Sequence, residues 1–519
     1  MTGGVEQRRP VERVRGTQDA WPAEAHPLAA VRAQLERTFA SFGYRRIEVP
    51  VIEPAELHLR KSGLDIISKL YAFEDQGGRQ LCLRPELTAS VVRAFVAQPP
   101  ARLPARLFST GPVFRYERPS RGRFRQFTHS GVELIGAQGP LADAEVVLLA
   151  AQALDALGLR DYTITVGHVG VLTELLTRLG LAGRLRAFLL ESAEEARRRG
   201  VVAVRQRLAA LDPELFEDGA STGGAPAAPI DAAGRNDTDD PAQIRAAVAA
   251  MIRTAGLEGL GRRAESDVVE RMVRKLAGRS QAEAVDRALG VIDRLGALRG
   301  TPDAVLAGGR EVLEAHSLSD APLRSLAATR DHLVALGLDT SRLTLDLGLS
   351  RGLQYYTGMV FEIDHAALGS ESQLCGGGRY DDLVRALGGR QPAPALGFAF
   401  GVERVALALA VEGRAAGAEA SGELFVVPAS AAAAGAAGRA AQALRAAGLR
   451  VHLDVTQRPV RNSLQFADRE GFTHVAVVTD VPDSEAAAVR LRDMRSGEER
   501  DVALSEVPAA LAMTPPVAV

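Results

Sequence analysis

Two strand-like segments joined by a short loop constrain the fold of this chain more than any other feature. Residues 106–116 (RLFSTGPVFRY) and 123–136 (RFRQFTHSGVELIG) are typical of strands, and the loop ERPSRG connects them. Helix-like stretches follow such strand pairs, in place of a regular strand–helix–strand alternation. This order favours an α+β fold in which an antiparallel sheet carries helices on one face.

The N-terminal part of the chain begins with a helix and an unusual strand. Residues 27–43 have apolar positions at helical spacing and end at a glycine. The next stretch, YRRIEVPVIEP, is rich in β-branched residues and contains Pro50. Proline removes one backbone donor from a sheet, so this strand is expected at an edge or against a partner.

Farther along, the periodicity changes several times. Residues 141–215 have a helical pattern that resumes after 217–242, a stretch full of Gly, Pro, Ala and Asp that predicts a loop or linker. Strand-like sequence returns at 342–364. A second linker, 413–422, precedes a unit whose strands and helices alternate as in a small α/β domain.

Length and composition exclude several classes of protein. A chain of 519 residues corresponds to about three or four domains. Hydrophobic residues make up 46% and charged residues 24%, which excludes a largely disordered or fibrous chain. The two cysteines, Cys82 and Cys375, are too few for a disulfide framework or a cysteine zinc site, and no other metal motif is visible. The polar N-terminus and the absence of a long apolar run predict a cytoplasmic protein with no membrane partner.

The loop of the strand pair is strongly basic although the chain has a net charge of −2. Between residues 102 and 125 seven arginines stand against one acid, Glu117, a local charge of +6. A solvated charged face is the ordinary explanation of such a run. Arginines on two strands and their loop instead suit a triphosphate, with Phe127 stacked on a base. Strand alternation predicts that Arg123 and Arg125 share one face.

Further candidate residues lie in a tyrosine pair, a glycine run and three acids. Arg351 precedes Tyr355 and Tyr356, which point to opposite faces if the segment is extended, one in the core and the other toward a ligand. The glycines at 376–378 permit close backbone approach, and Arg404 opens a helix. The acids Glu86, Glu117 and Glu133 are each ordinary salt-bridge candidates, but together they suit a ligand with ammonium and imidazole nitrogens.

Five motifs in this order resemble the class II histidyl-tRNA synthetases: LRPELT, GPVFRYERPSRGRFRQF, RGLQYYTGMVFE, GGGRYDDLV and GFAFGVERV. GYRRIEVPVIEP is similar to the first class II motif, whose proline lies at a dimer interface, and the C-terminal unit resembles the anticodon-binding domain of the family. The resemblance implies a class II antiparallel-sheet catalytic domain at 1–185 and 339–412, interrupted by a helical insertion at 186–338. It also implies a linker at 413–422 and an anticodon-binding-like domain at 423–519.

The resemblance implies that histidine is activated with ATP and Mg²⁺ and is then transferred to tRNA(His), by a homodimer. Arg115 would contact the α-phosphate, Arg404 the γ-phosphate, and Arg351 the developing pentacoordinate phosphorus. The rest of ATP would be held by Glu117, Arg123 and Phe127. The histidine site would comprise Glu86, Thr88, His129, Glu133, Tyr355 and Tyr356.

Two departures from the family pattern keep a second function open. The family usually reads RQFHQ and RGLD where this chain has RQFTHS and RGLQ, so that His129 and Gln354 replace a glutamine and an acid. Stretches such as LIGAQGPLADAEV resemble the synthetase-like regulatory subunit of ATP phosphoribosyltransferase, which senses histidine and whose partner is a short catalytic subunit. A catalytically silent paralogue is the third alternative. The retained Arg115, Arg351 and Arg404, together with the C-terminal domain, favour the synthetase.

Overall fold

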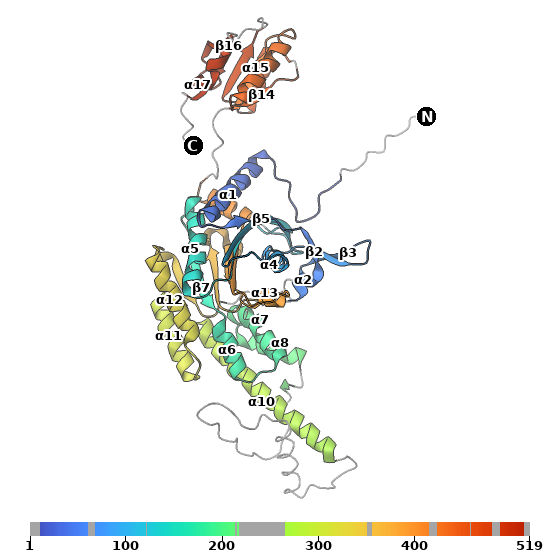
Figure 1. Ribbon diagram of the computed structural model, residues 1–519, viewed down its shortest axis with the longest axis vertical. Helices are drawn as coiled ribbons and strands as arrows, with labels where there is room; N and C mark the ends of the chain where they lie inside the picture. Colours follow the sequence, from blue (N-terminus) through green and yellow to red (C-terminus); the bar gives the residue numbers. More distant parts are fainter. Residues whose placement is uncertain are drawn as a thin grey trace, which may run out of the picture. The chain divides into compact units, whose positions relative to one another are not determined.

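The computed structural model describes residues 11–60, 68–120, 122–212, 215–216, 265–349, 355–414, 423–456, 458–479 and 488–512 (Figure 1). The expected loop at 217–242, most of the expected linker at 413–422, and both Arg351 and Gln354 lie outside these residues. The chain forms two compact units, Met1–Ala416 and Gly417–Val519.

The first unit is built on a nine-stranded sheet among its described residues. The strand order is β1 (Arg45–Arg46), β5 (Ala105–Phe114), β6 (Gln126–Ile135), β12 (Ala395–Gly401), β11 (Gln373–Arg379), β10 (Met359–Asp364), β7 (Thr163–His168), β9 (Leu343–Asp346) and β8 (Arg299–Gly300). All pairs are antiparallel except β1 with β5 and β7 with β9. The predicted antiparallel sheet and its basic hairpin, β5 with β6, are therefore confirmed.

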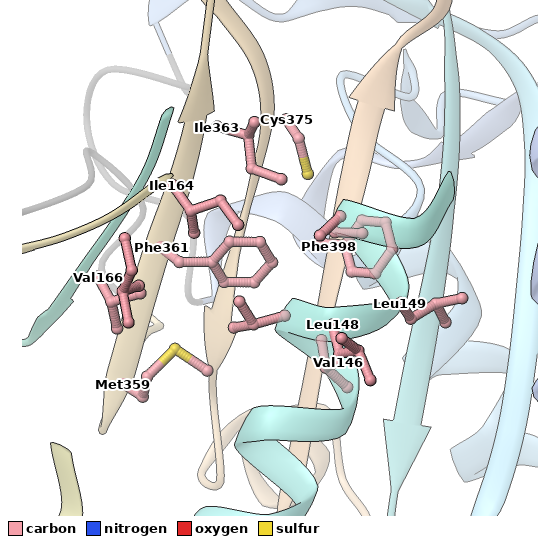
Figure 2. Close-up of a cluster of buried hydrophobic side chains, with 14 of the residues drawn as sticks. Val146, Leu148, Leu149, Ile164, Val166, Met359, Phe361, Ile363, Cys375 and Phe398 are labelled. Carbon is pink, nitrogen blue, oxygen red and sulfur yellow. The ribbon is translucent and has the colours of Figure 1, made fainter. Parts of the chain in front are cut away.

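Five of the described helices cover one face of this sheet, where the main core lies. This layer contains α1 (Pro22–Ser41), α5 (Pro140–Ala156), α11 (Pro302–Ala315), α12 (Ala321–Ala335) and α14 (Val402–Val411). Figure 2 shows side chains of α5 packed against those of β7, β10, β11 and β12. The prediction of helices on one face was incomplete, because α4 (Thr88–Ala97) and α13 (Leu383–Ala386) form a smaller core on the other face (Figure 1).

Strand alternation separates the two faces. In β6, Val132 and Leu134 enter the main core, whereas Glu133 and Ile135 point to the side of α4. In β12, Phe398 and Phe400 likewise enter the main core. The face toward α4 thus carries the buried carboxyl group of Glu133 and, on β12, the small residues Gly397 and Ala399. These small residues leave space for a ligand on this face.

Two sequence predictions need correction in detail. The stretch YRRIEVPVIEP does lie at edges, but it is divided between β1 and β2 (Ile52–Pro54), which belong to different sheets. β2 forms a three-stranded sheet with β4 (Gln80–Leu83) and β3 (Tyr71–Glu74), beside the short helix α2 (Ala55–Leu59). The uninterrupted helical pattern expected over 141–215 was wrong, because β7 lies within it. Its residues, TITVGH, are rich in β-branched side chains and pair with β10 and β9.

A second, helical core extends from the end of β7. It is formed by α6 (Gly170–Arg178), α7 (Gly183–Arg199), α8 (Val201–Leu211) and the described part of α10 (Glu265–Gly296). The stretch 186–338 is therefore distributed over two cores, since α11 and α12 pack on the main sheet.

The second unit has the predicted α/β character. Its sheet has the order β14 (Arg450–Leu453), β13 (Glu423–Pro428), β15 (His474–Val478), β16 (Ala488–Asp493) and β17 (Glu499–Ala503). β13, β14 and β15 are parallel, and β16 and β17 are antiparallel. One side is covered by α15 (Ala434–Ala446) and α17 (Val507–Ala512), and α16 (Val460–Arg469) packs in a separate apolar cluster.

Candidate active site

A cavity of about 120 Å³ lies on the face of the main sheet against which α4 packs. Ten of the residues predicted to form a site line it: Glu86, Thr88, Arg115, Glu117, Arg123, Phe127, His129, Tyr355, Tyr356 and Arg404. Glu133 lies next to the cavity and is bonded to Tyr380, which lines it. Arg351 lies outside the described residues. The structure thus brings residues from five distant motifs into one place.

β6 supplies one wall of this cavity. Phe127, His129 and Glu133 are odd-numbered residues of the same strand and so face the same side. The ring of His129 meets that of Phe127 edge to face, with centroids 5.2 Å apart. On the neighbouring strand Gly397 pairs with Glu133, and a Cβ at Gly397 would collide with the Glu133 carboxylate. Glycine at this position makes room for the buried acid.

One end of the cavity is a buried acid next to a tyrosine. Glu86 is 4% exposed and accepts a hydrogen bond from the Tyr355 hydroxyl, 2.9 Å from Oε2. Its other oxygen, Oε1, is buried and accepts no hydrogen bond from a described side chain, although the backbone N–H of Ala89 is near enough to the carboxylate to lower its pKa. Burial raises the pKa of Glu86 above its ordinary value, although the Tyr355 bond and the charge of Arg115 oppose this. Such an oxygen is ready to accept a hydrogen bond from a cationic ligand.

Glu133 is a second buried acid at this end. It accepts hydrogen bonds from the hydroxyls of Tyr380 and Thr88. Burial and, to a smaller extent, the nearby Glu86 together raise the pKa of Glu133 to about 8, against the lowering effect of the two hydroxyls. Tyr380 was not singled out from the sequence, although it belongs to the motif GGGRYDDLV. Its signal in the sequence is its place in that motif, just after the glycine run.

The two adjacent tyrosines do not point to opposite faces of a strand. β10 begins only at Met359, and Tyr355 lies in a turn before it. The two rings pack on each other with centroids 4.9 Å apart, and both contact Tyr380. Tyr355 is buried, whereas Tyr356 is partly exposed and lines the cavity beside it. The prediction of opposite faces applied only to an extended segment, and this condition is not met because Tyr355 lies in a turn. The division into one buried and one accessible ring is found.

The other end of the cavity is lined by arginines. The Arg115 guanidinium donates from Nε to the carbonyl oxygen of Pro85 over 2.9 Å and lies 5.4 Å from the centre of the Phe127 ring. Arg404 donates to backbone carbonyls and to Glu371, the last residue of the 3₁₀ helix η3 (Ala366–Glu371). Glu371 was not predicted as a site residue, because nothing in the local sequence distinguishes it from a surface acid.

Glu117 joins the basic loop to this end. It pairs with Arg123 and, at 3.2 Å, with Lys69. Burial raises the pKa of Glu117, but the Arg123 bond and the positive charges of Lys69 and Arg115 outweigh burial and hold it below the ordinary value. Lys69 is one of only three lysines in the chain and was also missed.

Strand alternation predicted that Arg123 and Arg125 share one face, but Arg125 makes different contacts. Its guanidinium lies over the Tyr116 ring at 4.2 Å and donates to the carbonyl oxygens of Glu117 and Arg15. The reason is that β6 begins only at Gln126, so residues 123–125 do not follow strand geometry.

No group of three or more His, Cys, Asp or Glu side chains in the described parts of the chain is placed to hold a metal ion. The acids at the arginine end, Glu117 and Glu371, already pair with cations. The described donor set therefore does not fit a resident metal. None of the described helices is long and apolar enough to cross a bilayer.

A larger cavity of about 620 Å³ lies where the end of β7 and the residues that follow β9 meet α6, α7 and α10. It shares only Tyr356 with the smaller cavity, and its lining is mainly aliphatic. Arg197 at its wall is bonded to the buried Asp346 at 2.9 Å. Because the converging charged groups are in the smaller cavity, that cavity is the candidate active site.

An antiparallel sheet with helices behind it, and a cavity that joins arginines to buried acids in front, is the architecture of the class II aminoacyl-tRNA synthetases. Solved structures agree with this fold. Histidyl-tRNA synthetase from S. aureus is 23% identical and covers 97% of this chain and 100% of its own, with a TM-score of 0.61. An ATP phosphoribosyltransferase regulatory subunit/histidyl-tRNA synthetase from Bacillus halodurans is 22% identical and covers 92% of this chain and 100% of its own, with a TM-score of 0.62.

Sequence comparison identifies the family. The family model described as histidyl-tRNA synthetase matches residues 16–257 and 246–405, and the model described as anticodon binding domain matches residues 423–513. This chain belongs to the histidyl-tRNA synthetase family. Among its relatives, the histidine–tRNA ligase of Methanosphaerula palustris is 33% identical over 95% of this chain and 97% of its own. That of Geobacillus kaustophilus is 32% identical over 95% of this chain and 96% of its own.

Proposed function

We propose that this chain is a histidine–tRNA ligase that activates histidine with ATP and transfers it to the 3′ end of tRNA(His). The observation that carries the proposal is the cavity of about 120 Å³, which has two chemically distinct ends, one of buried acids and one of arginines. An amino acid with a cationic amino group suits the first end, and a triphosphate suits the second. Membership of the ligase family supports the same assignment.

At the arginine end, we assign Arg115 to the α-phosphate and Arg404 to the γ-phosphate. The Nε bond from Arg115 to the Pro85 carbonyl holds its guanidinium in place before ATP arrives. Glu117, Arg123 and Phe127 would hold the remaining parts of ATP, with the Phe127 ring stacked on the base. Mg²⁺ would arrive with the triphosphate as part of the substrate, because the described residues do not form a metal site.

At the acidic end, we assign Glu86 and Thr88 to the amino group of histidine, and Glu133 and Tyr356 to its imidazole. The buried Oε1 of Glu86, which has no side-chain partner among the described residues, supports the first assignment. Tyr355 would act indirectly, since its hydroxyl orients Glu86. His129, which lines the cavity, would replace the glutamine that the family usually has at this position.

The reaction has two steps. A carboxylate oxygen of histidine attacks the α-phosphorus, the bond to the β-phosphate oxygen breaks, and pyrophosphate leaves. A hydroxyl group of the terminal ribose of tRNA then attacks the histidyl carbonyl carbon, and AMP leaves. Arg115 and Arg351 would stabilise the negative charge that develops at the α-phosphate in the first step. Charged tRNA is used in the cytoplasm, which remains the proposed location.

The second unit is the proposed site of tRNA anticodon contact, because residues 423–513 match the anticodon-binding family. We also propose a homodimer. Its support is the exposed apolar surface of the small sheet and its helix α2, where Ile52 on β2 is 51% exposed and Leu59 on α2 and Phe73 on β3 are also exposed. Sedimentation equilibrium of the full chain tests this proposal, and a monomer at micromolar concentration would contradict it.

Histidine-dependent exchange of pyrophosphate into ATP tests the main proposal. The purified chain is expected to catalyse exchange, and Arg351→Ala to abolish it. A folded preparation that binds ATP without exchange would contradict the proposal. The regulatory alternative instead expects co-purification with a short phosphoribosyltransferase catalytic subunit, and histidine-sensitive activity of that complex.

A further inference from the structure

Glu371 holds the two arginines that line the outer part of the arginine end. Its Oε2 accepts a hydrogen bond from Nη2 of Arg404 at 2.6 Å, and its Oε1 lies 3.6 Å from Nη1 of Arg123. The Ser120 hydroxyl is 3.4 Å from the same Oε1. Both arginines therefore have the same carboxylate as a partner. Arg404 is 33 positions and Arg123 is 248 positions away from Glu371 in the sequence.

The Arg404 guanidinium is fixed by two different kinds of acceptor. Nε donates to the carbonyl oxygen of Gly122 at 3.1 Å, and Nη1 donates to that of Gln373 at 3.0 Å. These carbonyls belong to the main chain and orient the plane of the guanidinium. Glu371 is the side-chain acceptor, and rotation about its own bonds can move it away. Its departure would leave Arg404 oriented and open one edge to another anion.

The arginine end needs an anion for electrostatic reasons. Burial lowers the pKa of Arg404, Glu371 raises it, and the charges of Arg115 and Arg123 lower it again. A partly buried cluster of like charges is unfavourable unless a negative group compensates it. In the described structure, Glu371 provides that compensation for Arg404.

We propose that Glu371 occupies the γ-phosphate position in the nucleotide-free protein and that the triphosphate of ATP displaces its carboxylate. Glu371 thereby sets the affinity for polyphosphates, since each binding event must first break the Glu371–Arg404 pair. This inference rests on the proposed function, because it takes Arg404 as the γ-phosphate ligand. On this proposal Glu371 weakens the binding of polyphosphates, whereas a residue that only positions the arginines would strengthen it.

Calorimetric titration of the full chain with MgATP, pyrophosphate and AMP tests the proposal. Glu371→Gln removes the charge and keeps the shape, so the Kd for MgATP and for pyrophosphate is expected to fall about tenfold. AMP has no γ-phosphate and does not reach Arg404, so its Kd is expected to change less than about twofold. Glu145→Gln is the matched control, because Glu145 pairs with Arg106 at 2.8 Å outside the cavity.

The titrations distinguish displacement of Glu371 by ATP from a positioning role of Glu371. Unchanged or weaker MgATP binding by Glu371→Gln would overturn the proposal, since a positioning residue or a ligand of the substrate's Mg²⁺ would lower the affinity when removed. Glu371→Asp draws the charge back from Arg404 and is expected to tighten binding by an intermediate factor, which provides a second variant if the first does not fold. A wild-type chain that binds no ATP at all would contradict the proposed function and not this inference alone.

Discussion

The two ends of the cavity both present ionisable groups to a ligand, but they differ in how those groups are buried and paired. At the acidic end, Glu86 and Glu133 are buried to 4% exposure, their side-chain hydrogen-bond partners are neutral hydroxyl groups, and burial raises the pKa of both. At the arginine end, the charged groups are more exposed and already paired with opposite charges, as in Glu117 with Arg123 and Glu371 with Arg404.

The difference follows from the ligands that we propose. An imidazole and an ammonium group are small, and a preformed buried carboxyl group can discriminate them at short range. A triphosphate has several charges, and arginines kept apart without counter-charges would repel one another in the free protein. Exchange of an internal carboxylate for phosphate avoids that cost. Changes at the acidic end should therefore be more damaging, and less sensitive to salt, than changes at the arginine end.

Glu86→Gln should have the largest effect. It removes the charge that faces the proposed amino group, and loss of a buried charged partner costs about 2–5 kcal/mol, so kcat/KM for histidine in the exchange assay should fall by about a hundredfold or more. The KM for ATP should change little. Glu53→Gln is the control, since Glu53 is equally buried but pairs with Arg93, 2.8 Å away and outside the cavity. An equal loss in both variants would mean that Glu86 acts only through stability.

Much of this site could be predicted from the sequence because its motifs are local. The hairpin places Phe127, His129 and Glu133 by alternation alone, once the strand is known. Motif order then supplied Glu86, Arg115 and Arg404, which the cavity brings together.

The residues that sequence reasoning missed depend on distant partners. Tyr380 meets Glu133 across 247 positions of sequence, and Glu371 meets Arg123 across 248. No local pattern marks an acid that will pair with an arginine so far away. β7 was missed for a related reason, because its short sequence is flanked by helices and its partners β9 and β10 lie nearly 200 residues later. Arg125 shows the converse, since strand alternation was applied to residues that precede the strand.

Arg404→Met should have an intermediate effect that is confined to the arginine end. Loss of a charged hydrogen bond costs about 1.5–3 kcal/mol, so the Kd for MgATP should rise roughly 10- to 100-fold, while the KM for histidine stays within about twofold. Added salt should weaken wild-type ATP binding more than histidine binding. Arg106→Met, which breaks an ion pair outside the cavity, is the control. A histidine KM that rises as much as the ATP Kd would show that the two ends are not independent.

The pH dependence of stability should show the smallest effect per pH unit, and it reports on Glu133 in the free protein. Its pKa is raised from 4.5 to about 8, so the folded state binds a proton that the unfolded state has lost between these values. Unfolding free energy should therefore fall as pH rises through this window, by at most about 1.4 kcal/mol per pH unit from this group.

Glu133→Gln cannot ionise and should remove this contribution, so the difference between wild type and variant in urea denaturation isolates it from that of Glu86, whose raised pKa acts in the same direction. A difference that grows in favour of the wild type with rising pH would mean a lowered pKa, as for the paired Glu117. The acidic end would then resemble the arginine end, and the contrast between buried, hydroxyl-bonded acids and paired charges would fail.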